Sequence, residues 1–179
     1  MCLAPGSEDH ALYTLIGHVT RDTRTYRYSA DSYARAMRVR PECPFARLYL
    51  ATIYTQIATQ RFTTNRASAS TQAVAFLSEY KKLRNPSVFG QEIHFNIGRV
   101  LQQLGLSTMA LIEYRKVLDL EPTLPVQTSS QGRANGRDHI HDRRIYDLRP
   151  EAAYNMSLIY KQSGNFILAK QIISKYCRI

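Results

Sequence analysis

The sequence has 179 residues and a formal net charge of +10, and 44% of its residues are hydrophobic. This length suits one domain or about five helical repeat units, and the composition excludes a disordered chain. The three cysteines, Cys2, Cys43 and Cys177, are too far apart for a disulfide framework or a zinc site and predict a reducing compartment. No apolar run approaches the ~20 residues of a membrane span, and no signal peptide is evident, so we expect a soluble intracellular chain.

Residues 9–41 predict a first pair of helices. Ile16 and Gly17 belong to the apolar stripe of the first helix, and Ser29 lies on the matching stripe of the second. Arg24 occupies the turn between the two helices, where a glycine is more usual. We therefore expect an eroded helical hairpin in this part of the chain.

Residues 43–84 predict a second, longer pair. Pro44 opens its first helix, and small or apolar residues at Ala69, Ala73 and Tyr80 mark the second. A polar turn separates the two helices. This pair exceeds the length of the others, so we expect longer helices or a longer loop.

Residues 90–122 have the clearest pattern, a helix, a tight turn and a second helix. Gly98 and Ala110 are the small residues of the two stripes, and we expect them to face each other so that the helices approach closely. Gly105 can adopt the positive φ that ends a helix, and Ser107 can cap the next one. These spacings predict a closely packed helical hairpin.

The residues of this hairpin resemble the tetratricopeptide (TPR) repeat, a helical hairpin of about 34 residues. The matching residues are Asn96, Ile97, Gly98, Leu101, Gly105, Ala110, Tyr114, Val117 and Pro122. His94 stands where the pattern prefers tryptophan. The repeat pattern indicates a fold, and it leaves the function open because such arrays bind many unrelated partners.

Residues 123–148 interrupt the pattern and predict a disordered or variable loop rich in Pro, Thr, Ser, Gln, Gly and Asn. His139 and His141 are the close histidine pair of the chain. Two residues apart, they cannot share one helical face, and no cysteine lies near, so we expect no metal site here.

Residues 149–179 predict a last hairpin, in which Gly164 and Ala169 repeat the spacing of Gly105 and Ala110. We expect the array to end here. The predicted fold is an all-α, TPR-type solenoid of about four helix pairs in a single array over residues 1–179. Its structural repeat positions are Gly17, Ser29, Gly98, Gly105, Ala110, Pro122, Gly164 and Ala169.

Catalytic motifs are missing from the sequence. It has no glycine-rich phosphate loop, nucleophile elbow, HExxH or CxxC. Glu113 and Lys116 are spaced as a surface ion pair of a helix. We therefore expect no enzymatic activity, no cofactor and no metal.

Arginines interleaved with tyrosines between Arg21 and Arg47 make this segment strongly basic. Arg35 and Arg38 lie three residues apart and should share one face of a helix. Arginine with aromatic residues suits contact with phosphates or stacking on bases. A solvated face, an acidic protein partner and nucleic acid all remain open.

Beyond the repeat, a particular succession of short segments runs along nearly the whole sequence. It includes Gly17-His18, Pro44-Phe45, Gln60-Arg61, Phe76-Leu77, Phe95-Asn96-Ile97-Gly98-Arg99, Gln103-Leu104-Gly105-Leu106, Ala153-Tyr154-Asn155-Met156 and Lys175-Tyr176-Cys177. This succession resembles the C-terminal TPR array in the TPR subunit of transcription factor IIIC (TFIIIC), the factor that recruits TFIIIB for RNA polymerase III.

This resemblance implies a non-enzymatic assembly scaffold in the nucleus that forms the distal part of a longer protein. The implied partners are other TFIIIC subunits, with TFIIIB components as further candidates. Contact with DNA would be indirect or weak, and no membrane contact is implied.

A scaffold of this kind binds partners in a concave groove lined by the first helix of each pair. The residues that flank the apolar stripes there are His18, Arg21, Phe95, Arg99, Gln102, Tyr154 and Lys161. A co-chaperone-like TPR adaptor that binds a peptide in the same groove is the alternative. Its clamp needs Lys, Arg and Asn converging from successive first helices. Phe95 and Tyr154 hold central positions of the groove instead, which favours the scaffold.

Overall fold

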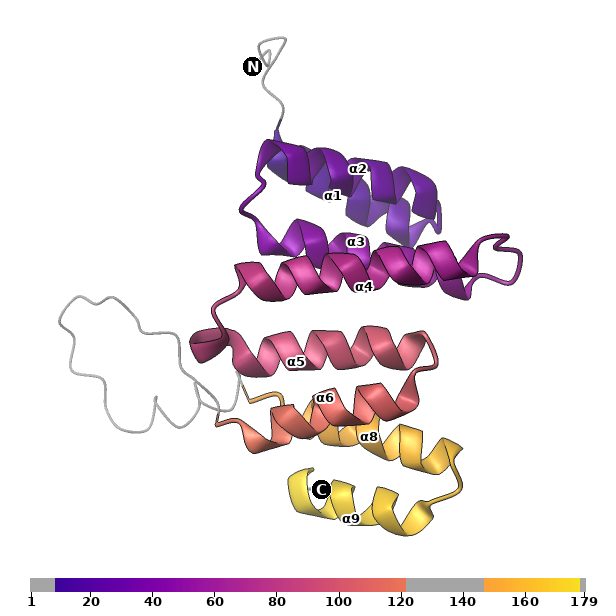
Figure 1. The fold of residues 1–179 in the computed structure, drawn as a ribbon, viewed down its shortest axis with the longest axis vertical. Coiled ribbons are helices and arrows are strands. Elements are labelled where there is room, and N and C mark those ends of the chain that lie inside the picture. Colours follow the sequence, from indigo (N-terminus) through magenta and orange to yellow (C-terminus); the bar gives the residue numbers. More distant parts are fainter. Residues whose placement is uncertain (1–8, 122–146, 178–179) are drawn as a thin grey trace, which may run out of the picture. The chain divides into compact units, whose positions relative to one another are not determined.

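The computed structural model describes residues 9–121 and 147–177, and their regular structure consists of eight helices (Figure 1). Consecutive helices form four antiparallel pairs, so the predicted all-α, TPR-type fold is confirmed. The helices are α1 (His10–Asp22), α2 (Tyr26–Val39), α3 (Pro44–Thr59), α4 (Arg66–Leu83), α5 (Pro86–Gln103), α6 (Ser107–Asp119), α8 (Arg149–Gln162) and α9 (Phe166–Tyr176).

The chain divides into two compact units, the first ending at Arg84 and the second beginning at Asn85. The first holds α1 to α4 and the second holds α5, α6, α8 and α9. A single array over residues 1–179 therefore stays a prediction. Pro122 and the loop predicted at 123–148, with its histidine pair, lie outside the described residues except for 147 and 148.

Buried tyrosine and aliphatic side chains form the core of the first unit. Tyr33, Leu50 and Ile53 are almost completely buried and pack together, and Tyr80 is fully buried on α4. Ile16 was predicted in the buried stripe of α1, but it is 39% exposed. The reason is that α1 packs mainly against α2, so Gly17 is the one residue of α1 that is buried.

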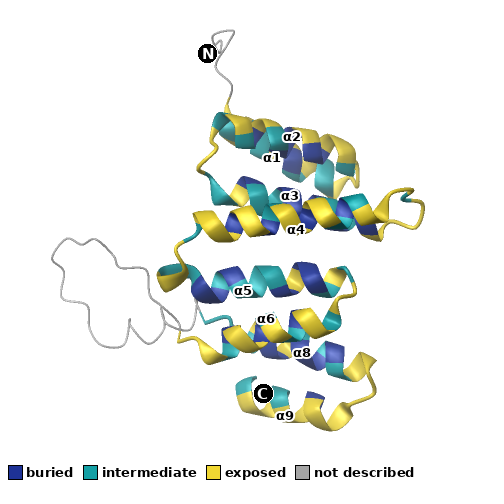
Figure 2. Ribbon diagram, viewed as in Figure 1, coloured by how far each residue is buried: buried dark blue, intermediate teal, exposed yellow. Residues whose placement is uncertain are grey.

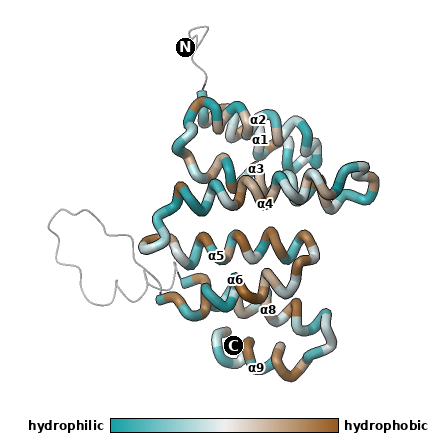
Figure 3. The backbone as a smooth tube through the Cα atoms, viewed as in Figure 1, coloured by the Kyte–Doolittle hydropathy of each residue, from teal (hydrophilic) through white to brown (hydrophobic). Residues whose placement is uncertain are grey.

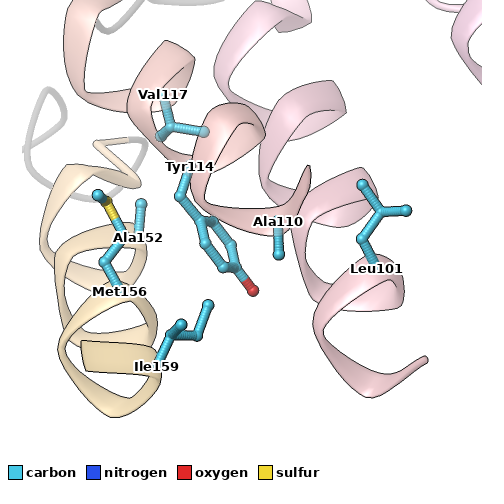
Figure 4. Packing of buried hydrophobic residues seen from close by; sticks show 7 residues of the cluster. All are labelled: Leu101, Ala110, Tyr114, Val117, Ala152, Met156 and Ile159. Carbon is cyan, nitrogen blue, oxygen red and sulfur yellow. The ribbon is translucent and has the colours of Figure 1, made fainter. Parts of the chain in front are cut away.

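The core of the second unit gathers side chains from α5, α6 and α8. Figure 4 shows Tyr114 between Ala110 of its own helix and the α8 side chains Met156 and Ile159. Along α5 the buried residues recur at helical spacing (Figure 2). In contrast, α9 begins with three exposed apolar residues, Phe166, Ile167 and Leu168, visible as a hydrophobic stretch in Figure 3.

Residues with positive φ form three of the four turns between paired helices. Gly105 and Gly164 have φ angles of 79° and 78°, and Arg24 adopts 60° at the corresponding place in the first hairpin. Ser107 was predicted to cap α6, and this was wrong. The backbone N–H of Ala110 donates to the carbonyl of Leu106 at 2.9 Å, so Leu106 is the cap residue and Ser107 already lies in the helix.

The buried side chain of Gln91 joins the end of α6 to the start of α8. Its Nε2 donates to the carbonyl of Leu120 at 2.7 Å, and its Oε1 accepts from the backbone N–H of Leu148 at 3.0 Å. The carbonyl of Leu120 and the N–H of Leu148 lie at helix ends and have no partner within a helix, so these two hydrogen bonds satisfy them. Gln91 therefore fixes the two described ends that flank residues 122–146.

Candidate protein-interaction site

The seven predicted groove residues are divided between the two units. His18 and Arg21 lie on α1 in the first unit, and the other five lie on α5 and α8 in the second. Whether all seven contribute to one surface stays a prediction.

His18 packs among aromatic rings. Its Nδ1 lies 2.8 Å from the hydroxyl of Tyr33, and its ring meets those of Tyr33 and Tyr49 edge to face, at centroid distances of 5.5 and 4.7 Å. Burial, and then the charge of Arg21, lower the pKa of His18. Arg21 itself pairs with Asp22 at 3.0 Å. The fit of His18 among these rings joins α1 to α2 and α3.

Phe95 and Arg99 form a small cation–aromatic unit on α5. The Phe95 ring is half-buried and lies 6.0 Å from the ring of Tyr114, centroid to centroid. The guanidinium carbon of Arg99 stands 5.9 Å from the Phe95 centroid while the side chain stays exposed. An exposed cation thus lies beside an aromatic surface that the core holds in place.

Gln102, Tyr114 and Asn155 connect three helices. The hydroxyl of Tyr114 donates to Oε1 of Gln102 on α5 at 2.7 Å and accepts from Nδ2 of Asn155 on α8 at 3.2 Å. Burial raises the pKa of Tyr114 to about 12, so the hydroxyl keeps its proton at neutral pH. These bonds fix Gln102 rather than leaving it free for a partner. The positive charge of Arg99 also acts on this hydroxyl.

Tyr154 and Lys161 are the freest of the predicted groove residues. Both lie on α8, Tyr154 with 54% of its surface exposed and Lys161 also exposed. Tyr154 directly precedes Asn155, whose side chain donates to the hydroxyl of Tyr114. The second unit therefore offers two aromatic side chains, Phe95 and Tyr154, and one arginine, Arg99, which are residue types enriched at protein interfaces.

Sequence reasoning missed two polar contributions to the second unit. Glu113 pairs with Lys116 as predicted, but it also lies 2.6 Å from Nδ1 of His94 on α5. Asn155 was noted only within the segment Ala153-Tyr154-Asn155-Met156 and not as a hydrogen-bond donor to Tyr114. For His94, the sequence did offer one indication that it packs against the second helix of its hairpin. It occupies the position where the repeat pattern prefers a tryptophan.

The basic residues Arg35 and Arg38 are both exposed on α2. The guanidinium carbon of Arg35 stands 5.9 Å from the centroid of the Tyr13 ring on α1. Arg38 forms no ion pair with a described residue. Their role in partner binding stays a prediction.

The repeat positions form close contacts between paired helices. Ser29 Oγ donates to the carbonyl of Gly17 at 2.8 Å, and Ala110 and Ala169 are buried. Gly98 was expected to face Ala110, but the atoms nearest to a Cβ built at position 98 all belong to the ring of Tyr114. The close approach of α5 and α6 is therefore between a glycine and a tyrosine ring.

Two kinds of site have no counterpart in the part of the chain that the structure describes. There, histidine, cysteine and acidic side chains nowhere cluster in threes as metal ligands. None of the described helices combines the length and apolarity needed to cross a membrane.

Comparison with known proteins identifies the repeat and its relatives. The tetratricopeptide repeat model matches residues 91–124 and 150–179, the two hairpins of the second unit. General transcription factor 3C polypeptide 3 of Homo sapiens is 33% identical over 96% of this chain and 18% of its own length. Transcription factor tau subunit sfc4 of Schizosaccharomyces pombe is 36% identical over 98% of this chain and 17% of its own. Two hairpins of the chain thus match the tetratricopeptide repeat, and nearly the whole chain is similar to TFIIIC and tau subunits.

The tau 131 kDa subunit of Saccharomyces cerevisiae is 28% identical over 78% of the chain and 12% of its own length. The chain thus spans less than a fifth of each of these relatives, and it matches their C-terminal part. The resemblance to the TFIIIC subunits, predicted from the sequence, is confirmed. It extends over the first unit as well as the second.

Proposed function

We propose that this TPR array is a non-enzymatic interaction scaffold within a TFIIIC-type complex and supports transcription initiation by RNA polymerase III in the nucleus. The observation that carries the proposal is the similarity to named TFIIIC and tau subunits over nearly the whole chain. Other subunits of the complex are the proposed partners, with TFIIIB components as further candidates.

The second unit supports a scaffold role because it combines a rigid frame with exposed anchors. The bonds between Gln102, Tyr114 and Asn155 hold α5, α6 and α8 together. Arg99, Tyr154 and Lys161 remain exposed on that frame. The helices that carry these side chains are held in place before binding, so less conformational freedom is lost on association, which favours affinity.

A competition experiment tests the proposal. Excess purified chain is added to a nuclear extract that transcribes one RNA polymerase III template and one RNA polymerase II template. A scaffold fragment should occupy its partners and lower transcription from the first template alone. Equal transcription from the first template with and without the chain would contradict the proposal.

Two double variants of the chain define which surface binds a partner in this competition. Arg35→Glu/Arg38→Glu should compete less well if the basic face of α2 binds a partner, and Tyr154→Ala/Lys161→Ala should do so if α8 does. The residues are exposed, so helicity should be unchanged in both variants. Full competition by both would remove these two surfaces from the proposal.

A further inference from the structure

The first unit contains a groove of about 760 Å³ at the end where α2 and α4 begin. The start of α2, the end of α3, the loop of residues 60–65 and the start of α4 form its walls. Figure 1 shows this loop extending beyond α3 and α4. Its charged and aromatic lining side chains include Arg24, Arg27, Tyr28, Asp31, Tyr54 and Phe62.

Positive charge predominates in this groove. Arg24 and Arg27 line it, and neither forms an ion pair with a residue that the structure describes. The start of α2 also lies here, and Thr25 offers no side-chain hydrogen bond to its free N–H groups. Unpaired N–H groups at a helix start carry a partial positive charge. Asp31 is the acidic residue on the lining.

Aromatic side chains stand exposed at the same groove. Phe62, in the loop between α3 and α4, is 89% exposed, and Tyr28 is 71% exposed. Tyr54 also lines the groove and stacks on Phe76, with ring centroids 5.6 Å apart. Large exposed aromatic rings beside arginines are the residues most often found as anchors in protein interfaces.

We propose that this groove binds an acidic segment of a partner protein, with carboxylates at Arg24 and Arg27 and a large apolar side chain against Tyr28 and Phe62. Charge complementarity selects this occupant, because the chain has a net charge of +10 and the groove has unpaired guanidinium groups. The inference goes beyond the scaffold proposal and holds whichever complex supplies the segment.

A nucleic acid fits the groove less well. Its binding needs a succession of cations along the phosphate backbone, whereas two arginines line this groove. The remaining polar lining includes the neutral side chains of Gln60, Thr63 and Gln72. Such side chains can hydrogen-bond to the N–H and C=O groups of an extended peptide.

Fluorescence anisotropy with the full chain tests this inference. The probe is a labelled synthetic peptide in which glutamates surround a phenylalanine. A second peptide has the glutamates replaced by glutamine, a third has the phenylalanine replaced by alanine, and a labelled single-stranded oligonucleotide is the competing probe. Each is titrated at low and at physiological salt, because screening shortens to about 8 Å in the latter.

Four variants separate the groove from general surface charge. Arg24→Gln/Arg27→Gln removes its cations, and Phe62→Ser removes the exposed ring. Lys81→Gln/Lys82→Gln removes the same charge from the exposed end of α4, outside the lining. Asp31→Asn removes the opposing charge. Circular dichroism melts should match wild type for all four, since the substituted side chains are exposed.

Of the four probes, the acidic peptide should bind wild type most tightly. Arg24→Gln/Arg27→Gln should lower the affinity for this peptide by roughly five-fold or more, whereas Lys81→Gln/Lys82→Gln should leave it unchanged. Phe62→Ser should lower the affinity for the acidic peptide and leave the salt dependence of binding unchanged. Asp31→Asn should raise this affinity. Equal weakening by the arginine and lysine pairs, tighter binding of the oligonucleotide, or no binding of the peptide would each overturn the proposal.

Discussion

The ring of Tyr114 on α6 lies directly against Gly98 on α5, so that a Cβ at position 98 would stand 2.7 Å from its Cε1 atom. Tyr33 has the same relationship to Gly17 in the first unit. In both hairpins a glycine admits a buried tyrosine ring between the paired helices. This pairing sets how closely the helices approach.

Gly98→Leu and Ala110→Leu should each destabilise the second unit. Either side chain overfills a closed contact, which costs on the order of 1–3 kcal/mol, or more where the helices cannot separate. Thermal melts followed by circular dichroism measure the effect, with Thr108→Leu at an exposed position of α6 as control. Unchanged midpoints for both variants would show that α5 and α6 do not meet at these residues.

Tyr114→Phe should lower the free energy of unfolding by about 1 kcal/mol, the net contribution of a typical hydrogen bond. The change leaves Gln102 and Asn155 without the hydroxyl that joins them. Urea denaturation checks the value, and Tyr154→Phe, which alters an exposed tyrosine, should leave it unchanged. Equal stability of Tyr114→Phe and wild type would exclude an energetic role for this bridge.

The helix pairs could be predicted from the sequence because turn residues and small residues recur at fixed spacing. Gly105 and Gly164 occupy the turns, and Ala110 and Ala169 are buried as the pattern predicted. These features depend on local backbone geometry and on the spacing within one hairpin. Patterns within single hairpins were therefore enough to predict the helix pairs.

The environment of individual side chains could not be predicted in the same way. His18 was selected as a groove residue, yet its ring partners Tyr33 and Tyr49 come from two other helices. Whether Ile16 is buried depends on what covers α1, which the pattern within α1 does not contain. Asn155 donates to a tyrosine in the preceding hairpin. Contacts between hairpins decide these positions.

Arg24→Gly should stabilise the first unit by about 0.5–1 kcal/mol. An L-residue in the left-handed region costs roughly 1–2 kcal/mol, and the greater freedom of glycine in the unfolded chain offsets part of that gain. The reciprocal change, Gly105→Ala, should destabilise by a similar amount, because its Cβ would meet no atom within 4 Å and only the backbone preference changes. If the urea midpoints of the two variants shifted in the same direction, this explanation by backbone preference would be contradicted.

The second unit should lose stability in acid through Glu113. Burial raises the pKa of this carboxyl, but hydrogen bonds from Lys116 and His94, with their charges, outweigh burial and hold it below the ordinary value of 4.5. The unfolded chain therefore binds the proton more readily. The stabilising contribution is complete above that ordinary value and is lost as the pH falls through the lower, folded-state pKa.

Urea midpoints measured from neutral pH down to about pH 3 check this dependence, which follows from proton linkage. Wild type should lose stability more steeply than Glu113→Gln below the ordinary pKa of a glutamate. Asp119→Asn, at an exposed acid of the same helix, should retain the wild-type slope. Parallel curves for wild type and Glu113→Gln would assign the acid sensitivity to other groups.

Affinity purification of the tagged chain from a nuclear extract, followed by mass spectrometry, tests the scaffold role most directly. The account predicts that wild type recovers other subunits of the TFIIIC complex in amounts comparable to its own, and that the packing variant Gly98→Leu loses them. The account would be contradicted if wild type recovered chaperones without such subunits. It would also be contradicted if a Gly98→Leu chain that is shown to be unfolded recovered the subunits in the same amounts as wild type.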